Sequence, residues 1–143
     1  MQNINIGSGE VRLTVNGDES RMIRFNPNDL NFVDKFLRLT EDLGAKQAEY
    51  MQKAEELDAA KSGGSDTLKA GLELLKEICG YFREKIDEVF GPGTSQAAFG
   101  DTMSLDMFED FFAGIAPMIQ KARSAKTAKY TGGFNRSQRR AQK

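Results

Sequence analysis

The stretch from Val89 to Asp101, VFGPGTSQAAFGD, combines residue types that loops use to bind phosphate: three glycines, a Thr-Ser pair and an acid. A phosphate loop of the Walker type also needs a lysine after its last glycine and a hydrophobic strand before it, because the lysine reaches the terminal phosphates. Here a helical pattern precedes the stretch, and no basic residue lies between Lys85 and Lys121. We therefore interpret it as a connector between helices.

Each residue of this connector has a structural role that requires no ligand. Gly91 ends the preceding helix, Thr94 or Ser95 caps one short helical turn, and Gly100 ends that turn. The apolar residues at 97–99 can then face the core. The sequence predicts a shaped turn at this place.

Other residues that could perform chemistry are scarce. The chain has no histidine, which excludes Ser-His, Cys-His and His-metal sites. Cys79 is the single cysteine and lies on the apolar face of a predicted helix, which favours a buried, inert thiol. Asp106 and Asp110 are one helical turn apart near a helix start, where they stabilise the helix dipole. We expect no enzyme activity, no cofactor and no metal.

The N-terminus, MQNINIGSGE, has no basic segment followed by an apolar run, and no stretch approaches 18 apolar residues. These features predict a cytoplasmic protein that neither spans a membrane nor binds one.

A β-hairpin is predicted within residues 1–25. VRLTV and RMIRF alternate apolar and polar residues, and the Asn16-Gly17 pair between them is a strong turn signal. We expect a loop of five residues, 16–20, and an extension of the sheet by residues 4–6. A lone hairpin is marginally stable, so it should pack on helices or pair with another chain.

Two long helices follow. The first is expected to begin with Asn26 as its cap, to carry apolar residues every seven positions, and to bend near Gly44; SGGS at 62–65 forms an elbow. The second has the most regular apolar seam, which consists of Leu68, Leu72, Leu75, Cys79, Phe82, Ile86 and Val89. Such a seam requires a helical partner. An internal core is favoured, and an oligomer seam is the alternative.

A third main helix follows Ser104 and is dense in apolar residues. Core packing explains most of them, but we predict that some form a partner-binding surface: Phe108, Phe111, Phe112, Ile115 and Met118. Pro117 should kink or restart this helix.

Charge divides the chain. Residues 1–117 hold 12 basic and 21 acidic side chains, a net charge of −9, whereas residues 118–143 hold eight bases and no acid. The sequence predicts a mainly α fold, a single helical domain at 1–120 in which the hairpin precedes a bundle of three main helices, and a flexible basic tail at 121–143. Arg136, Arg139 and Arg140 mark this tail. It is a solvated segment, a contact for an acidic surface, or less favourably a nucleic-acid arm.

The order of these elements, with IRFNPNDLNFVDKF, IDEVFGPGTSQAAFGD and SLDMFEDFFAGIAP, resembles the small tail assembly chaperones of long-tailed phages and prophages of Gram-positive bacteria. The resemblance covers most of residues 20–120. It implies a non-enzymatic, oligomeric protein of the host cytoplasm that binds and solubilises the tape-measure protein, helps to recruit tail-tube subunits and is absent from the mature virion. Whether a longer, frameshifted product exists is open.

Two other hypotheses remain. One is a structural or adaptor subunit of a phage or prophage particle, which could use its hairpin for sheet addition. The other is a nucleic-acid-binding protein that uses the basic tail.

Overall fold

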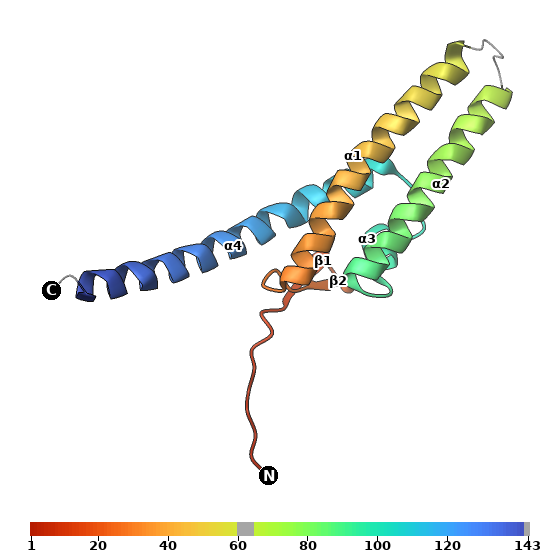
Figure 1. The fold of residues 1–143 in the computed structure, drawn as a ribbon. Helices are drawn as coiled ribbons and strands as arrows, with labels where there is room; N and C mark the ends of the chain where they lie inside the picture. Colours follow the sequence, from red (N-terminus) through yellow and green to blue (C-terminus); the bar gives the residue numbers. More distant parts are fainter. Residues whose placement is uncertain (60–64, 142–143) are drawn as a thin grey trace.

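The computed structural model places a β-hairpin before four helices, in agreement with the predicted mainly α fold (Figure 1). It describes the backbone of residues 1–59 and 65–141 and the side chains of residues 1–56 and 66–129. The elements in order are β1 (Val11–Val15), β2 (Asp18–Phe25), α1 (Leu30–Ala59), α2 (Ser65–Phe90), α3 (Thr94–Phe99) and α4 (Leu105–Ala141). The predicted elbow at 62–65 lies outside the described residues except for Ser65, which begins α2.

The hairpin has a tighter turn than expected. β1 and β2 pair antiparallel, and only Asn16 and Gly17 separate them. Both residues have positive φ, 54° and 75°, as a type I′ turn requires. The five-residue loop was therefore wrong. Residues 4–6 do not extend the sheet either, because residues 1–10 form no strand.

Helix α1 begins later than the sequence pattern indicated. Asn26 Oδ1 accepts a hydrogen bond from the Asn28 amide at 2.9 Å, which closes a turn before the helix. Asp29 Oδ1 accepts from the Asn31 amide at 3.0 Å, the bond made by a cap two residues before its donor. The helix is thus capped by Asp29, and the prediction of Asn26 as the cap was wrong. Gly44 does not interrupt α1.

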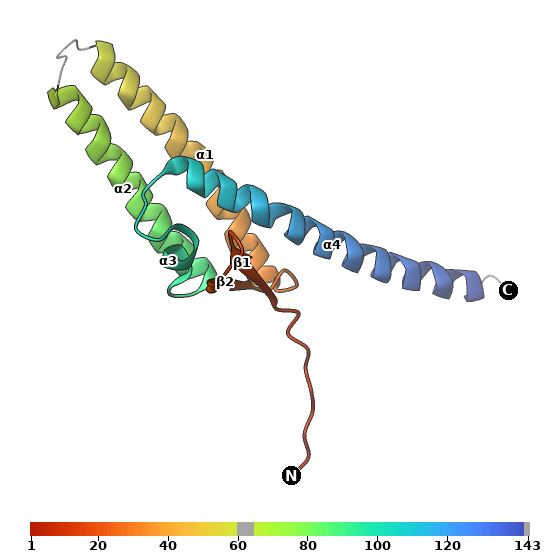
Figure 2. The same cartoon turned by 180° about the vertical axis from the view of Figure 1, so that it is seen from behind.

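Helices α1 and α2 form a long antiparallel pair that divides into two regions (Figures 1 and 2). Buried residues of this pair run only as far as Leu43 in α1 and start at Ile78 in α2. We call residues 44–59 and 65–77 the arm. We call the rest of α1 and α2, together with the hairpin, α3 and residues 105–119 of α4, the body.

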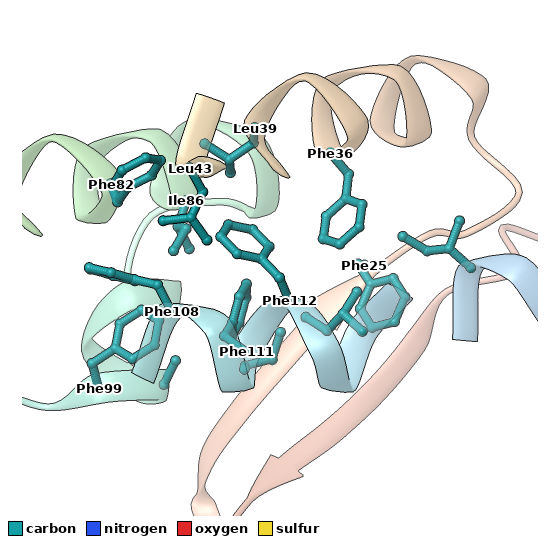
Figure 3. Close-up of a cluster of buried hydrophobic side chains, with 14 of the residues drawn as sticks. Phe25, Phe36, Leu39, Leu43, Phe82, Ile86, Phe99, Phe108, Phe111 and Phe112 are labelled. Atoms are coloured by element: carbon teal, nitrogen blue, oxygen red, sulfur yellow. The ribbon is translucent and has the colours of Figure 1, made fainter. Parts of the chain in front are cut away.

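The core of the body is built mainly from phenylalanine rings (Figure 3). Phe82 and Phe108 have ring centroids 5.7 Å apart, and Phe108 in turn contacts Phe99 edge to face at 4.8 Å. Phe36 contacts Phe112 with centroids 5.6 Å apart. Such edge-to-face pairs add about 0.5–1.5 kcal/mol each to the burial of the rings. Rings from α1, α2, α3 and α4 therefore hold the body together.

Helix α4 continues through Pro117, so the restart, one of the two effects that we expected of this proline, does not occur. Among the α4 side chains that are described, up to residue 129, the last buried one is Ile119. Beyond it the helix projects from the body as far as Ala141, on the side away from the arm (Figure 2). We call residues 120–141 the extension. The backbone of the predicted basic tail is thus helical as far as Ala141.

Candidate interaction surfaces

The polar groups of the glycine-containing connector form hydrogen bonds with other residues of the same chain. Asp87 accepts hydrogen bonds from the amide and the hydroxyl of Ser95, at 2.8 and 2.9 Å. Thr94 donates its hydroxyl to the Gly91 carbonyl at 2.8 Å. The cap of α3 is Gly93, with φ of 88° and no side-chain bond, so neither Thr94 nor Ser95 caps it as predicted. The groups that would bind phosphate are thus engaged in shaping the turn.

Two arginines clamp the connector to the rest of the body. Arg21 of β2 donates to the carbonyls of Ala97 and Ala98, both at 2.8 Å. Arg83 of α2 donates to the Gly100 carbonyl at 2.6 Å. These bonds satisfy carbonyls at the end of the short helix, which supports the interpretation of this stretch as a structural joint.

The side chains that could react chemically occupy positions in which they have a structural role. Cys79 is buried, and burial raises the pKa of its thiol, which disfavours the nucleophilic thiolate. Among the described residues, no group of three or more His, Cys, Asp or Glu side chains could hold a metal ion. Asp106 and Asp110 are exposed at the start of α4.

A polar contact joins α1 to α2 near the boundary between body and arm. Tyr81 donates its hydroxyl to the Asp42 carboxylate, and this bond raises the pKa of Tyr81 to about 12. The ammonium groups of Lys46 and Lys85 lie 5.2 and 5.6 Å from the centre of the tyrosine ring. These contacts fix the two helices at the point where the aromatic core ends.

The predicted partner-binding surface is mostly core, so that prediction was wrong. Phe108, Phe111, Phe112 and Ile115 are all buried. Phe111, for example, meets Phe90 of α2 with ring centroids 5.1 Å apart. Only Met118 is accessible, with 39% of its surface exposed. The sequence identified an apolar face correctly but could not show that α1, α2 and α3 cover it.

An apolar groove of about 420 Å³ lies between β1 and the first half of α4. Leu13 and Val15 line it from the hairpin, and Met107 and Met118 line it from the helix. Among the described residues that line the groove, Asp110 alone is charged. Alternation in β1 had predicted the apolar side of the hairpin, but its position opposite α4 follows only from the fold.

A second apolar surface runs along the arm. Leu68 is 76% exposed and Leu72 is 51% exposed, and both belong to the seam that continues into the body as Cys79, Phe82 and Ile86. Met51 of α1 is also exposed. We call Leu68, Leu72 and the half-buried Leu75 the arm ridge. The sequence predicted the seam, but not that half of it would remain uncovered.

The extension carries the excess positive charge. Within its described side chains, Lys121, Arg123, Lys126 and Lys129 form no ion pair. Arg136, Arg139 and Arg140 lie in the helical backbone of α4, but their side chains are outside the described ones. The predicted role of these arginines stays a prediction.

Within the described residues, no helix has the length and apolar character needed to cross a membrane.

Comparison with known proteins adds one relationship. Neither the curated proteins nor the solved structures give a match. A family described as a family of unknown function, DUF6673, matches residues 16–143, which is most of the chain. The resemblance to tail assembly chaperones therefore stays a prediction. By this match the chain belongs to the DUF6673 family.

Proposed function

We propose that this chain is a non-enzymatic assembly chaperone whose arm binds a helical segment of an elongated protein. The observation that carries the proposal is the arm ridge. In the body, α4 covers the seam of α2, as the contact between Phe82 and Phe108 illustrates. In the arm, Leu68 and Leu72 present the same helix face with no described segment over them. A helix from another protein would complete the packing there.

The size of the ridge supports reversible binding. Leu68 and Leu72 lie four residues apart, so they form one continuous surface along the helix. Full burial of a leucine contributes about 1.5–3 kcal/mol, and part of this gain is offset by the entropy lost on association. A single arm would therefore bind weakly. Many copies along one long partner would cover it and still be displaced one at a time.

The resemblance to tail assembly chaperones supplies the identity of the partner. We propose the tape-measure protein, which is long and largely helical, with later recruitment of tail-tube subunits. The chaperone would act as a homo-oligomer in the host cytoplasm and would be absent from the mature virion. A structural or adaptor subunit would instead be retained, so mass spectrometry of purified particles separates these two roles.

Co-expression with the tape-measure protein tests the proposal. We expect the wild-type chain to raise the soluble fraction of the tape-measure protein, and Leu68→Glu/Leu72→Glu to abolish this effect, because two charges replace the apolar ridge. Leu37→Glu is the matched control, since Leu37 is 53% exposed but lies on α1 in the body. The proposal fails if the double variant still solubilises the partner, or if Leu37→Glu loses the effect equally.

A second candidate function is nucleic-acid binding by the extension. It is favoured by four basic side chains that form no ion pair among the described residues: Lys121, Arg123, Lys126 and Lys129. If Z phosphates are contacted, the logarithm of the affinity should fall against the logarithm of salt concentration with a slope of roughly −0.9Z. A response that does not change with salt would exclude this function.

A further inference from the structure

The N-terminal segment and the apolar groove of the body have matching chemistry. We propose that residues 3–7 of one copy form a strand that pairs with the free edge of β1 in a second copy. In this arrangement Ile4 and Ile6 fill the partner's groove between β1 and α4. The proposal is independent of the function proposed for the arm.

The donor segment is an exposed strand sequence without a sheet. Residues 1–10 run away from the body and form no strand, although NINI alternates polar and apolar residues (Figures 1 and 2). Ile4 is 78% exposed and Ile6 is 82% exposed. In an extended strand, residues two positions apart point to the same side, so the two isoleucines form one apolar face. Two large apolar side chains exposed together indicate a surface that is covered in the assembled state.

The receiving edge belongs to β1. In the described part of the chain, β1 pairs with β2 alone, so its other edge keeps free amides and carbonyls. Val11, Leu13 and Val15 are half-buried whereas Arg12 and Thr14 are exposed, which shows that the odd-numbered residues face inward. An added strand with Ile6 opposite Leu13 and Ile4 opposite Val15 would place both isoleucines on that inward side.

Charge and hydrogen bonding both fit this occupant. The segment from Gln2 to Gly9 contains no charged side chain. Among the described residues that line the groove, only Asp110 carries a charge, so docking of the segment would bury almost no charged group. The backbone groups of the added strand that face β1 would pair with the free edge of β1, and the pairing would continue the existing two-stranded sheet.

The geometry favours a second copy over the segment's own groove. The Ser8 carbonyl accepts a hydrogen bond from the Asn26 side chain, and the side chain of Asn28 lies close to Gly9. These contacts hold the base of the segment against the loop before α1, and residues 1–7 point away from β1 (Figure 1). Each copy has one donor and one groove, so a reciprocal exchange closes a symmetric dimer.

Light scattering on the purified full chain tests this exchange. We expect the wild type to have twice the 15.9 kDa mass of one chain. Ile4→Asp/Ile6→Asp should reduce the mass to that of one chain, because it places charges in the groove. Asn3→Asp/Asn5→Asp adds the same charges on the opposite side of the strand and should remain dimeric. A wild type that is monomeric at all concentrations, or an unchanged mass for the isoleucine variant, would overturn the proposal.

A crosslink distinguishes exchange from folding back onto the same copy. Asn5 and Thr14 would lie opposite each other on the outward side of the pair. One chain with Asn5→Cys, mixed under oxidising conditions with a tagged chain with Thr14→Cys, should give a disulfide-linked heterodimer. An Asn5→Cys/Thr14→Cys chain that closes only an internal disulfide would show that the segment occupies its own groove and would refute the exchange.

Discussion

Helices α1 and α2 run through both the body and the arm, yet their buried apolar residues lie in the body, and the described ones of the arm are exposed or half-buried. In the body, α2 buries Cys79, Phe82 and Ile86 against neighbouring elements. In the arm, the same helix face continues with Leu68 and Leu72, and these remain exposed. The difference is not in the helix but in what lies over it, because α4 begins within the body and runs away from the arm (Figure 2).

The composition of the arm reinforces this contrast. The body packs aromatic rings from four helices, whereas the arm has no buried residue among its described side chains. On α1 its surface carries Glu49 between Lys46 and Lys53, and the hydrogen bond from Lys53 lowers the pKa of Glu49. Exposed ion pairs of this kind contribute little to stability. The arm therefore depends on the body for its stability and leaves its apolar ridge exposed.

The largest difference between the regions should come from truncating apolar residues. Phe82→Ala removes a ring with no exposed surface and should lower the free energy of unfolding by about 3–5 kcal/mol. Leu72→Ala should change it by no more than about 0.5 kcal/mol, because Leu72 is largely exposed. Urea unfolding of both variants measures this. Equal losses would mean that the arm is as tightly packed as the body.

The connector provides a second, intermediate test. Asp87→Ala leaves the amide and hydroxyl of Ser95 without their acceptor inside the body, and should cost about 1–3 kcal/mol. Glu84→Ala, at an exposed position of the same helix, should have little effect. If the two variants unfold at the same urea concentration, the bonds of Asp87 do not hold the connector.

The smallest effect concerns the contact between Tyr81 and Asp42. The pKa of Tyr81 is raised to about 12 from an ordinary value near 10. The protonated phenol that donates to Asp42 is therefore stabilising below pH 10, and this contribution is lost as the pH rises from 10 to 12. Tyr81→Phe should lower the stability slightly at neutral pH. It should also make the stability fall less steeply as the pH rises from 10 to 12. Thermal unfolding from pH 8 to 11.5 measures the difference, and parallel curves for both proteins would contradict it.

The sequence predicted those features of the fold that interactions between neighbouring residues determine. The helices, the Asn-Gly turn signal and the use of Gly91 to end α2 all follow from neighbouring residues. The cap at Asp29 was missed because two nearby residues, Asn26 and Asp29, can both cap, and the side chain of Asn26 closes a preceding turn.

The binding surfaces could not be predicted in the same way. Spacing shows which side of a helix is apolar, but not which other element covers that side. Phe108 and Phe112 looked as available as Leu68 and Leu72, and only the course of α4 decides between them. The groove beside β1 likewise combines residues about a hundred positions apart, such as Leu13 and Met118.

Hydrogen exchange in α2 tests the role of the arm most directly. In the free protein, amides of residues 65–77 should exchange faster than those of residues 78–90, because fewer packed side chains protect them. In a complex with the tape-measure protein, we expect exchange at 65–77 to slow by about tenfold or more, equivalent to about 1.4 kcal/mol, with little change at 78–90. Unchanged exchange at 65–77 in the complex would contradict binding by the arm ridge.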